Sequence, residues 1–271
     1  MLKSFVRFFL KEDEYFINKK DKYYIESCDF IENDKENIKR FLTEDKFMNL
    51  VSLKCCIFSS ILYKYKDCSW VETFLEFLNI ENYTIHLGKN GLVYGLFLDK
   101  YKTCYLVFKG STTFSDFFQD SKITLVKIKN IDGKVHKGFS EMMVNNYDDI
   151  KINLQSFCNY NSVRKIYVTG HSLGGALSTI FYKIHKDSSD IFIKHVTFGS
   201  PRIGNKEFCK NIDSIRVVNK ADFVTMIPFS FNYLHIDYKQ PIGETYKLLS
   251  IKDHFMEEYY KSIKNFFLKI S

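Results

Sequence analysis

The 271-residue chain lacks the sequence patterns by which proteins commonly hold metals, nucleotides or a disulfide framework. It contains no HExxH, no P-loop, no G-x-G-x-x-G and no cluster of cysteines and histidines, so we expect no metal and no cofactor. Its seven cysteines are an odd number without a CxxC pair, and the neighbours Cys55 and Cys56 would bridge each other only with strain. These features favour reduced thiols in an intracellular, cytoplasmic setting.

Long apolar runs and massed charge of one sign are also missing. The stretch VSLKCCIFSSILYKY, which begins at Val51, is interrupted by Lys54 and is too short to span a bilayer. No small-residue cleavage site follows the partly apolar N-terminus, so we expect no secretory signal and a soluble protein. The net charge is +7, but lysines alternate with acids and no basic stripe carries spaced aromatics. This pattern argues against nucleic-acid binding and leaves weak attraction to anionic membrane surfaces open.

The composition that is present is that of a globular protein, with 45% hydrophobic and 26% charged residues. Aromatic residues make up 17% of the chain, which favours a large aromatic core over an exposed lipid-binding surface. Residues 1–45 are charge-rich and carry no chemical motif, and we predict a helical N-terminal extension there. Residues 46–271 are predicted to form one α/β domain, which begins with a buried helix over residues 46–65.

Strand-like and helix-like patterns alternate along this domain. Residues 92–110 form two β runs around a polar turn at 99–102, which predicts a hairpin. Short β-branched strands are expected at residues 164–170, 193–200 and 214–222, and helices are expected after residue 137 and over residues 176–186. This alternation predicts a central, mostly parallel or mixed sheet that is flanked by helices.

The segment VTGHSLGGAL, Val168 to Leu177, places a serine between two glycines after an apolar run. Its centre fits G-x-S-x-G, which is a nucleophile elbow when a strand precedes it and a helix follows. Glycines are needed because the turn strains the serine backbone and because side chains beside it would collide with strand and helix. The alternative is a serine that caps a helix N-terminus. The pattern consists of Gly170, His171, Ser172, Leu173 and Gly174.

Several other segments accompany the elbow, and together they resemble the class 3, or fungal-type, lipases of the α/β-hydrolase fold. The segments occur in the order that this family uses, which is more specific than any single motif. They are FKGSTTFSDFFQD (residues 108–120), VHKGF (135–139), VTGHSLGGAL (168–177), VTFGSPRIGN (196–205), RVVNKADFVTMIP (216–228), YLH (233–235) and DHFMEEYY (253–260).

The resemblance implies a serine–aspartate–histidine triad in this chain order. Asp222 follows the β run SIRVV, where a strand end would present it beside the elbow, although a turn-capping aspartate is the alternative. The block DH-x-x-x-x-Y resembles the family segment with the catalytic base, so His254 is assigned as the base. His235 is the other candidate base, and we expect His171 to be structural. Asp213 and Asp237 are less well placed than Asp222.

Acyl transfer also requires donors for an oxyanion. The backbone N–H of Leu173, which follows the nucleophile, is one candidate. The family places the second donor on the residue after the glycine that ends an earlier strand, which is Ser111 here. Beyond Ser111, an amphipathic turn is equally compatible with a mobile lid and with a fixed helix. Its aromatic residues are Phe114, Phe117 and Phe118.

The expected activity is therefore that of a serine hydrolase, similar to a triacylglycerol lipase, which cleaves carboxylic esters of lipids through an acyl-enzyme. Two alternatives stay open. One is a phospholipase A1-like acyl hydrolase, and the other is a catalytically silent family member that binds lipid or a protein. The expected partner is a lipid ester, met in solution or at a membrane or droplet surface.

Overall fold

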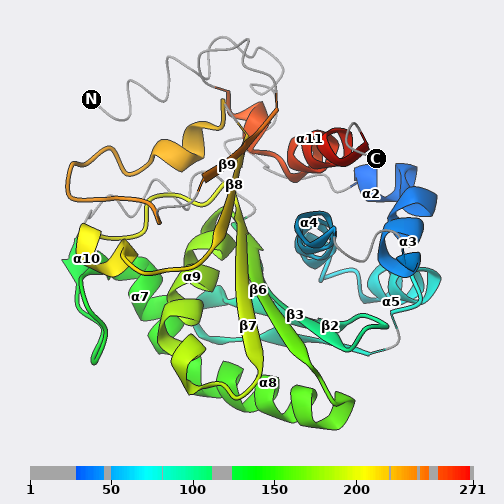
Figure 1. Cartoon of the computed structure of the whole chain (residues 1–271), viewed down its shortest axis with the longest axis horizontal. Helices are drawn as coiled ribbons and strands as arrows, with labels where there is room; N and C mark the ends of the chain where they lie inside the picture. The colour runs from blue at the N-terminus through cyan, green and yellow to red at the C-terminus, as the bar shows by residue number, and fades with distance from the viewer. Residues whose placement is uncertain are drawn as a thin grey trace.

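The computed structural model describes residues 29–45, 50–80, 82–111, 124–219, 221–236, 239–243 and 250–268. Within this part of the chain, a seven-stranded sheet runs through the middle of the molecule in the order β1-β2-β3-β6-β7-β8-β9 (Figure 1). The strands are β1 (Tyr83–Leu87), β2 (Val93–Leu98), β3 (Thr103–Phe108), β6 (Lys165–His171), β7 (Phe192–Phe198), β8 (Ile215–Asn219) and β9 (Lys239–Ile242). A small second sheet pairs β4 (Leu125–Val126) with β5 (Val135–His136).

The main sheet is mixed. β1, β2 and β3 pair antiparallel, whereas β3, β6, β7, β8 and β9 pair parallel. In β3 the buried side chains alternate between two cores, with Tyr105 and Val107 on one side and Cys104, Leu106 and Phe108 on the other. Burial on both faces is typical of parallel strands and explains their nearly continuous apolar sequences.

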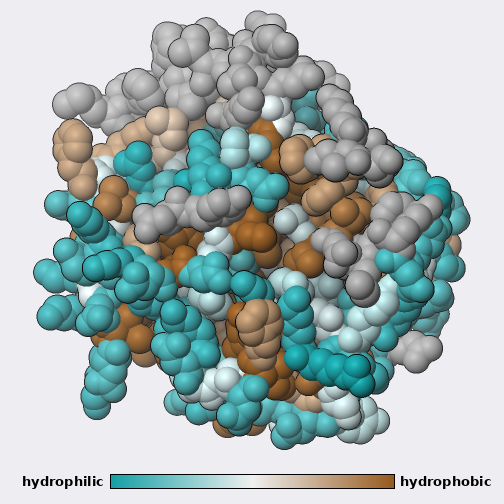
Figure 2. Space-filling view, in the orientation of Figure 1, coloured by the Kyte–Doolittle hydropathy of each residue, from teal (hydrophilic) through white to brown (hydrophobic). Residues whose placement is uncertain are grey.

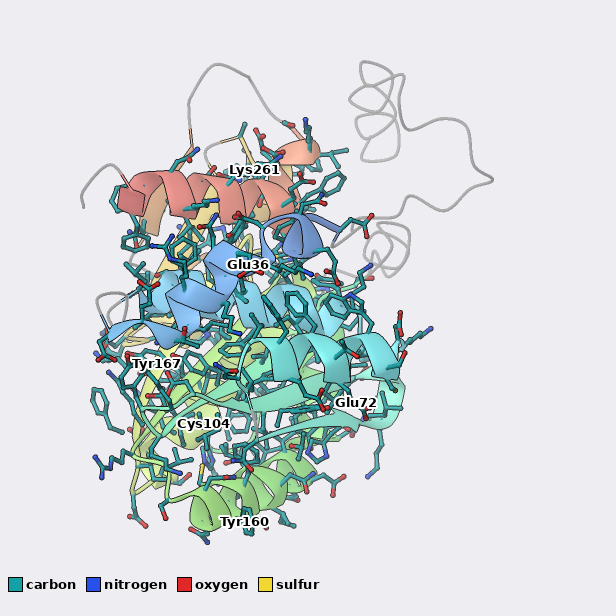
Figure 3. The ribbon with its side chains drawn as sticks, turned by 90° about the vertical axis from the view of Figure 1, so that its right-hand side faces the viewer. Glu36, Glu72, Cys104, Tyr160, Tyr167 and Lys261 are labelled. Carbon is teal, nitrogen blue, oxygen red and sulfur yellow. The ribbon has the colours of Figure 1, made fainter. Side chains whose placement is uncertain are left out.

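Helices cover both faces of the sheet (Figure 1). One face is covered by α4 (Val51–Tyr63), and around it lie α2 (Asp29–Asn33), α3 (Lys35–Thr43), α5 (Cys68–Phe77) and α11 (Met256–Leu268). The other face carries α7 (Lys137–Val144), α8 (Tyr147–Asn161) and α9 (Leu173–His185). Figure 3 shows these layers from the side, with Lys261 of α11 above the sheet residues Tyr167 and Cys104 and with Tyr160 of α8 below them.

The aromatic content fills these cores, as predicted. Among the largest fully buried side chains are Tyr94, Tyr105, Phe58, Phe97, Phe108, Phe181 and Phe198. Phe58 of α4 stacks on Phe97 of β2 with ring centroids 4.9 Å apart, and this contact fastens the helix to the sheet. In the part of the chain that the structure describes, no helix is long and apolar enough to cross a membrane.

The hairpin predicted over residues 92–110 is present, with β2 and β3 joined by a turn in which Lys102 has a φ of 60°. The strands predicted around the elbow and the helix after it are also present. The buried helix predicted from residue 46 begins at Val51 as described, and residues Ser52 to Leu62 are all buried. Elements that the sequence patterns did not predict are α5, α8, α11, β1 and β9.

The predicted N-terminal extension contains α2 and α3 among its described residues. Ile31, Ile38 and Leu42 from these helices lie in the same core as α4 and the sheet. Asp34, between the two helices, accepts hydrogen bonds from the Tyr260 hydroxyl and from Lys264 Nζ, both on α11. The division of the chain at residue 45 stays a prediction.

Candidate active site

Ser172 lies at the turn between β6 and α9. Its backbone has φ 57° and ψ −125°, a conformation that residues other than glycine rarely adopt. The turn is close-packed, because a Cβ atom at Gly170 would lie 2.3 Å from the carbonyl oxygen of Gly174 and one at Gly174 would lie 2.0 Å from that of Phe108. The Ser172 N–H donates to the Phe198 carbonyl over 2.9 Å. The glycines of the motif are therefore required by packing.

The end of β3 lies beside this turn. Phe108 pairs with Gly170 in the parallel register, and a Cβ atom at Gly110 would lie 2.7 Å from the carbonyl oxygen of His171. Ser111, the next residue, is consequently at the same edge of the sheet as Leu173, the first residue of α9. Helix N-termini carry backbone N–H groups without helical partners, which suits the stabilisation of a negative oxygen.

Asp222 and His254 form a buried pair at the neighbouring strand end. Asp222 follows β8 and caps the short helix η5 (Phe223–Met226), where its Oδ1 accepts from the Val224 N–H over 2.9 Å. The Nδ1 of His254 lies 3.0 Å from Asp222 Oδ1 and 2.9 Å from Oδ2. Both side chains are fully buried. The carboxylate therefore fixes Nδ1 as the protonated nitrogen of the ring, because a carboxylate only accepts.

Two contacts bring this pair to the elbow. Gly199 follows β7, and a Cβ atom there would lie 2.7 Å from Asp222 Oδ2 and 2.9 Å from His254 Nδ1. The pair therefore packs directly against the backbone of this glycine, where no side chain would fit. The ring of His171, the residue before Ser172, lies 4.5 Å from the ring of His254 between centroids. The structure thus brings Ser172, Asp222 and His254 together at one edge of the sheet.

His171 has a structural environment, as its position in the motif predicted. Its Nε2 lies 2.7 Å from the backbone carbonyl of His254 and must donate there, which leaves Nδ1 to accept from the Tyr63 hydroxyl at 2.8 Å. Burial and then the neighbouring His254 hold the pKa of His171 well below its usual range, so the ring stays neutral. Tyr63 is on α4, 108 residues away in sequence, and no local pattern could have identified it.

Tyr259 is a second residue that the sequence reasoning left without a role. Its hydroxyl donates to Asp222 Oδ2 over 2.6 Å and accepts from the Asn219 N–H over 3.1 Å. Burial, and then the Asp222 charge, raise the pKa of Tyr259 well above its usual range, so it remains a donor. Tyr259 is the final residue of the DH-x-x-x-x-Y block, so the signal was present in the sequence.

The other candidates lie elsewhere. His235, the alternative base, bonds through Nε2 to the Thr225 carbonyl and not to Asp222, and burial lowers its pKa to about 3. Asp213 is exposed and pairs with Lys194 at 3.1 Å. The proposed lid residues Phe114, Phe117 and Phe118 lie outside the described residues. Among the described residues, no group of three or more His, Cys, Asp and Glu side chains could hold a metal.

A second serine–histidine pair occurs in the core. Ser178 Oγ of α9 lies 3.0 Å from Nε2 of His195 on β7 and donates to the Gly175 carbonyl over 2.9 Å. Because the hydroxyl proton points to Gly175, His195 is the donor in this pair. Burial lowers the pKa of His195 to about 3. This histidine therefore cannot act as a base at neutral pH.

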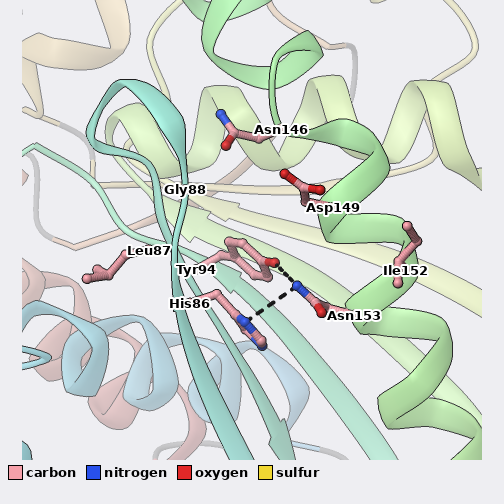
Figure 4. A pocket seen from close by; sticks show the side chains of 8 residues that line it. All are labelled: His86, Leu87, Gly88, Tyr94, Asn146, Asp149, Ile152 and Asn153. Carbon is pink, nitrogen blue, oxygen red and sulfur yellow. Dashed lines mark hydrogen bonds between the residues drawn. The ribbon is translucent and has the colours of Figure 1, made fainter.

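A pocket between β1 and α8 is separate from the elbow (Figure 4). Asn153 Nδ2 donates to the Tyr94 hydroxyl over 2.7 Å and contacts the His86 ring at 3.4 Å. Burial lowers the pKa of His86, so this ring is neutral and the charge in the lining is that of Asp149. None of the lining residues belongs to the predicted site.

Comparison with known proteins gives concordant matches. Residues 105–232 match the family described as lipase (class 3). The chain is 35% identical over 156 residues to a lipase of Rhizopus oryzae and 34% identical over 155 residues to a lipase of Rhizomucor miehei. These alignments cover 52% and 51% of this chain but only 39% and 41% of the two relatives, so the chain spans about two fifths of their length.

Solved structures show the same fold. The triacylglyceride lipase of Rhizomucor miehei superposes with a TM-score of 0.62 at 22% identity, over 74% of this chain and 82% of that chain. A lipase of Rhizopus microsporus var. chinensis superposes with a TM-score of 0.61 at 22% identity, over 78% of this chain and 86% of that chain. The predicted α/β-hydrolase fold, with its mostly parallel sheet between helices, is therefore confirmed.

Proposed function

We propose, because residues 105–232 match the class 3 lipase family, that this chain is a serine hydrolase that cleaves carboxylic esters of lipids through an acyl-enzyme. The observation that carries the proposal is the meeting of three features at one sheet edge. These are a serine in a strained turn, a buried histidine whose ring contacts the residue before that serine, and a carboxylate 2.9 Å from the histidine Nδ1.

Each residue has a role in this reaction. Ser172 Oγ attacks the ester carbonyl carbon while Nε2 of His254 takes the hydroxyl proton, and Asp222 holds the ring and stabilises its positive charge. The backbone N–H groups of Leu173 and Ser111 receive the oxyanion. The proton on Nε2 passes to the leaving alcohol, which leaves the acyl group on Ser172. Water, deprotonated by His254, then attacks this ester, and the proton passes from Nε2 to Ser172 Oγ as the bond to the acyl group breaks and the fatty acid is released.

The same machinery would serve a phospholipase A1-like hydrolase, because the head group leaves with the alcohol and does not touch the triad. From the match to the lipase family, we infer that the substrate is a lipid ester. We also infer that the protein binds this substrate at a membrane or droplet surface. An intracellular location accords with the six cysteines of the described residues, among which no disulfide is formed.

The first experiment compares wild type, Ser172→Ala and Ser178→Ala on p-nitrophenyl butyrate and on a long-chain ester emulsion. We expect turnover to vanish in Ser172→Ala and to persist in Ser178→Ala, the matched serine in the core. A fluorophosphonate probe should label Ser172 alone, as read by peptide mass spectrometry. Absence of both turnover and labelling in folded wild type would replace the proposal with the silent lipid- or protein-binding alternative.

A further inference from the structure

The loop that follows η5 displays apolar side chains to solvent. Phe231 is 105% exposed, which means that its ring protrudes completely, and Phe229 and Leu234 are 39% and 42% exposed. Apolar side chains gather on the surface in this part of the molecule, at the upper left of Figure 2. Burying a phenylalanine ring stabilises a folded protein, and a fully exposed ring contributes none of this free energy. A cluster of exposed apolar side chains is therefore often a binding surface.

The loop is held firmly by its own backbone. Ser230 N–H donates to the Pro228 carbonyl over 2.9 Å, and Tyr233 N–H donates to the Ser230 carbonyl over 3.1 Å. At its two ends, the Ile227 carbonyl accepts from Arg202 N–H and Leu234 N–H donates to the Gly204 carbonyl, both over 2.7 Å. Tyr233 points inward and is buried. The turn therefore keeps Phe231 outside.

The loop also adjoins the candidate active site. The ring of Phe229 contacts that of Phe223, with centroids 5.6 Å apart, and Phe223 is the residue after Asp222. Bridges from Leu234 to Gly204 and from Gly204 to Val135 place two other segments alongside. A surface that receives this loop would consequently lie next to the triad.

Charge around the loop follows a clear pattern. Residues 223–236 contain no Asp, Glu, Lys or Arg. The two segments bridged to the loop, residues 127–137 and 202–210, together contain seven Lys or Arg residues and two Asp or Glu residues. An uncharged aromatic tip with a basic surround suits an anionic lipid surface, in which rings enter the headgroup layer while lysines meet lipid charges.

We propose that residues 229–234 form an anchor that inserts Phe231 into an anionic lipid surface and presents the triad to the esters there. The occupant is a lipid headgroup layer; a second copy of this chain is the competing occupant. The inference builds on the proposed function for its purpose, but the binding itself requires no hydrolysis. It can therefore be measured in the Ser172→Ala protein.

The first test measures binding of the 271-residue chain with Ser172→Ala to vesicles of phosphatidylcholine with and without phosphatidylglycerol. We expect binding to the anionic vesicles that weakens as salt is raised, and about tenfold weaker binding after Phe231→Ser. The matched control is Phe192→Ser, which removes a 57% exposed ring at the start of β7, the end of the sheet opposite Ser172. This control should bind as the parent does.

Three results would overturn the anchor: equal binding of the parent and Phe231→Ser, an equal loss in Phe192→Ser, or equal binding to phosphatidylcholine alone. Sedimentation without lipid tests the competing occupant. A wild-type dimer that Phe231→Ser converts to monomer would assign the loop to self-association.

Phe231→Trp gives an independent readout. Its fluorescence should be quenched by brominated lipid, with Trp70 in the unsubstituted protein as the reference, and an unquenched signal would exclude insertion. Failure of the proposed function would show differently, as absent ester turnover with vesicle binding intact.

Discussion

Ser172 precedes α9 and Ser178 lies six residues later in the middle of the same helix, and each is near a histidine. His195 on β7 contacts Ser178 directly, whereas the ring of His254 contacts His171, the residue before Ser172. Only Ser172 belongs to a site that could do chemistry. Ser178 is helical and gives its proton to Gly175, so His195 must donate to it. Ser172 has a left-handed backbone, and its neighbour His254 donates Nδ1–H to a carboxylate.

The difference shows that a serine beside an imidazole is not a nucleophile by proximity alone. His195 has no carboxylate on its ring, and its Nδ1 has no hydrogen-bond partner among the described residues. Protonating this ring would bury an uncompensated charge, which explains why burial takes its pKa to about 3. His254 differs because Asp222 lies against it, so a positive charge formed during proton transfer would be paired at once.

Of the substitutions considered, removing the Asp222 carboxylate should lower ester hydrolysis the most. We expect Asp222→Asn to lower kcat/KM by about 10⁴-fold, because the amide can donate to Nδ1 and thereby hold the ring in the wrong tautomer. Ester hydrolysis at pH 7 measures the loss. Asp213→Asn, at an exposed aspartate, is the control, and a comparable loss there would contradict the assignment of Asp222.

For the buried pair of Ser178 and His195, a change of pH should alter the free energy of unfolding and not the activity. Folded His195 takes up its proton near pH 3, whereas an unfolded histidine does so near pH 6.5. The unfolded chain therefore binds more protons between these values, and the free energy of unfolding falls as pH is lowered through this range. For His195 the loss between pH 6.5 and pH 4 is about 3 kcal/mol.

Urea unfolding of wild type and His195→Gln at several pH values measures this contribution. The variant should be less dependent on pH below 6.5, and the two should differ by a constant amount above it. Parallel curves throughout would mean that His195 is not the group responsible.

Loss of the hydroxyl that holds Asp222 should have a smaller effect on catalysis. Tyr259→Phe removes one hydrogen bond to a charged group, and we expect kcat to fall about tenfold. Tyr260→Phe is the matched control on the same helix, because its hydroxyl bonds to Asp34 instead. Both variants should lose stability, which thermal unfolding measures, but only Tyr259→Phe should lose activity beyond the fraction unfolded.

The smallest effect is expected at Tyr63. Tyr63→Phe leaves His171 Nδ1 without its hydroxyl donor, and a neutral hydrogen bond of this kind contributes about 1 kcal/mol. Since His171 holds the backbone of His254, we expect kcat to fall about threefold at constant KM. Tyr65→Phe is the control. An equal fall of kcat in both variants would contradict the claim that Tyr63 acts through its hydrogen bond to His171.

The sequence predicted the features that depend on neighbouring residues. The β-branched run before Gly170 and the apolar helix after it identified the elbow, and the alternation around residues 99–102 identified the hairpin. The patterns of α8 and β9 were weaker. β9 is a four-residue strand with a proline, and α8 shows its apolar spacing only at Ile150, Leu154, Phe157 and Cys158.

Long-range partners could not be obtained in this way. The meeting of Asp222 with His254 was expected only because the segments resemble a known family. The contact of Tyr63 with His171 spans 108 residues, and it exists because α4 packs across the sheet beneath the elbow. Hydrogen-bond partners of this kind depend on how layers pack, which no local period encodes.

The consecutive tyrosines of α11 have a consequence for synthesis on the ribosome. Tyr259 bonds to Asp222, and Tyr260 bonds to Asp34 near the beginning of the described chain. The elbow can form once β3, β6 and β7 have emerged, but the histidine and the helix that secures the aspartate follow some eighty residues after Ser172. The contact between Asp222 and His254 therefore cannot form before α11 is synthesised and packs on α2 to α4, long after the residues of the elbow have emerged.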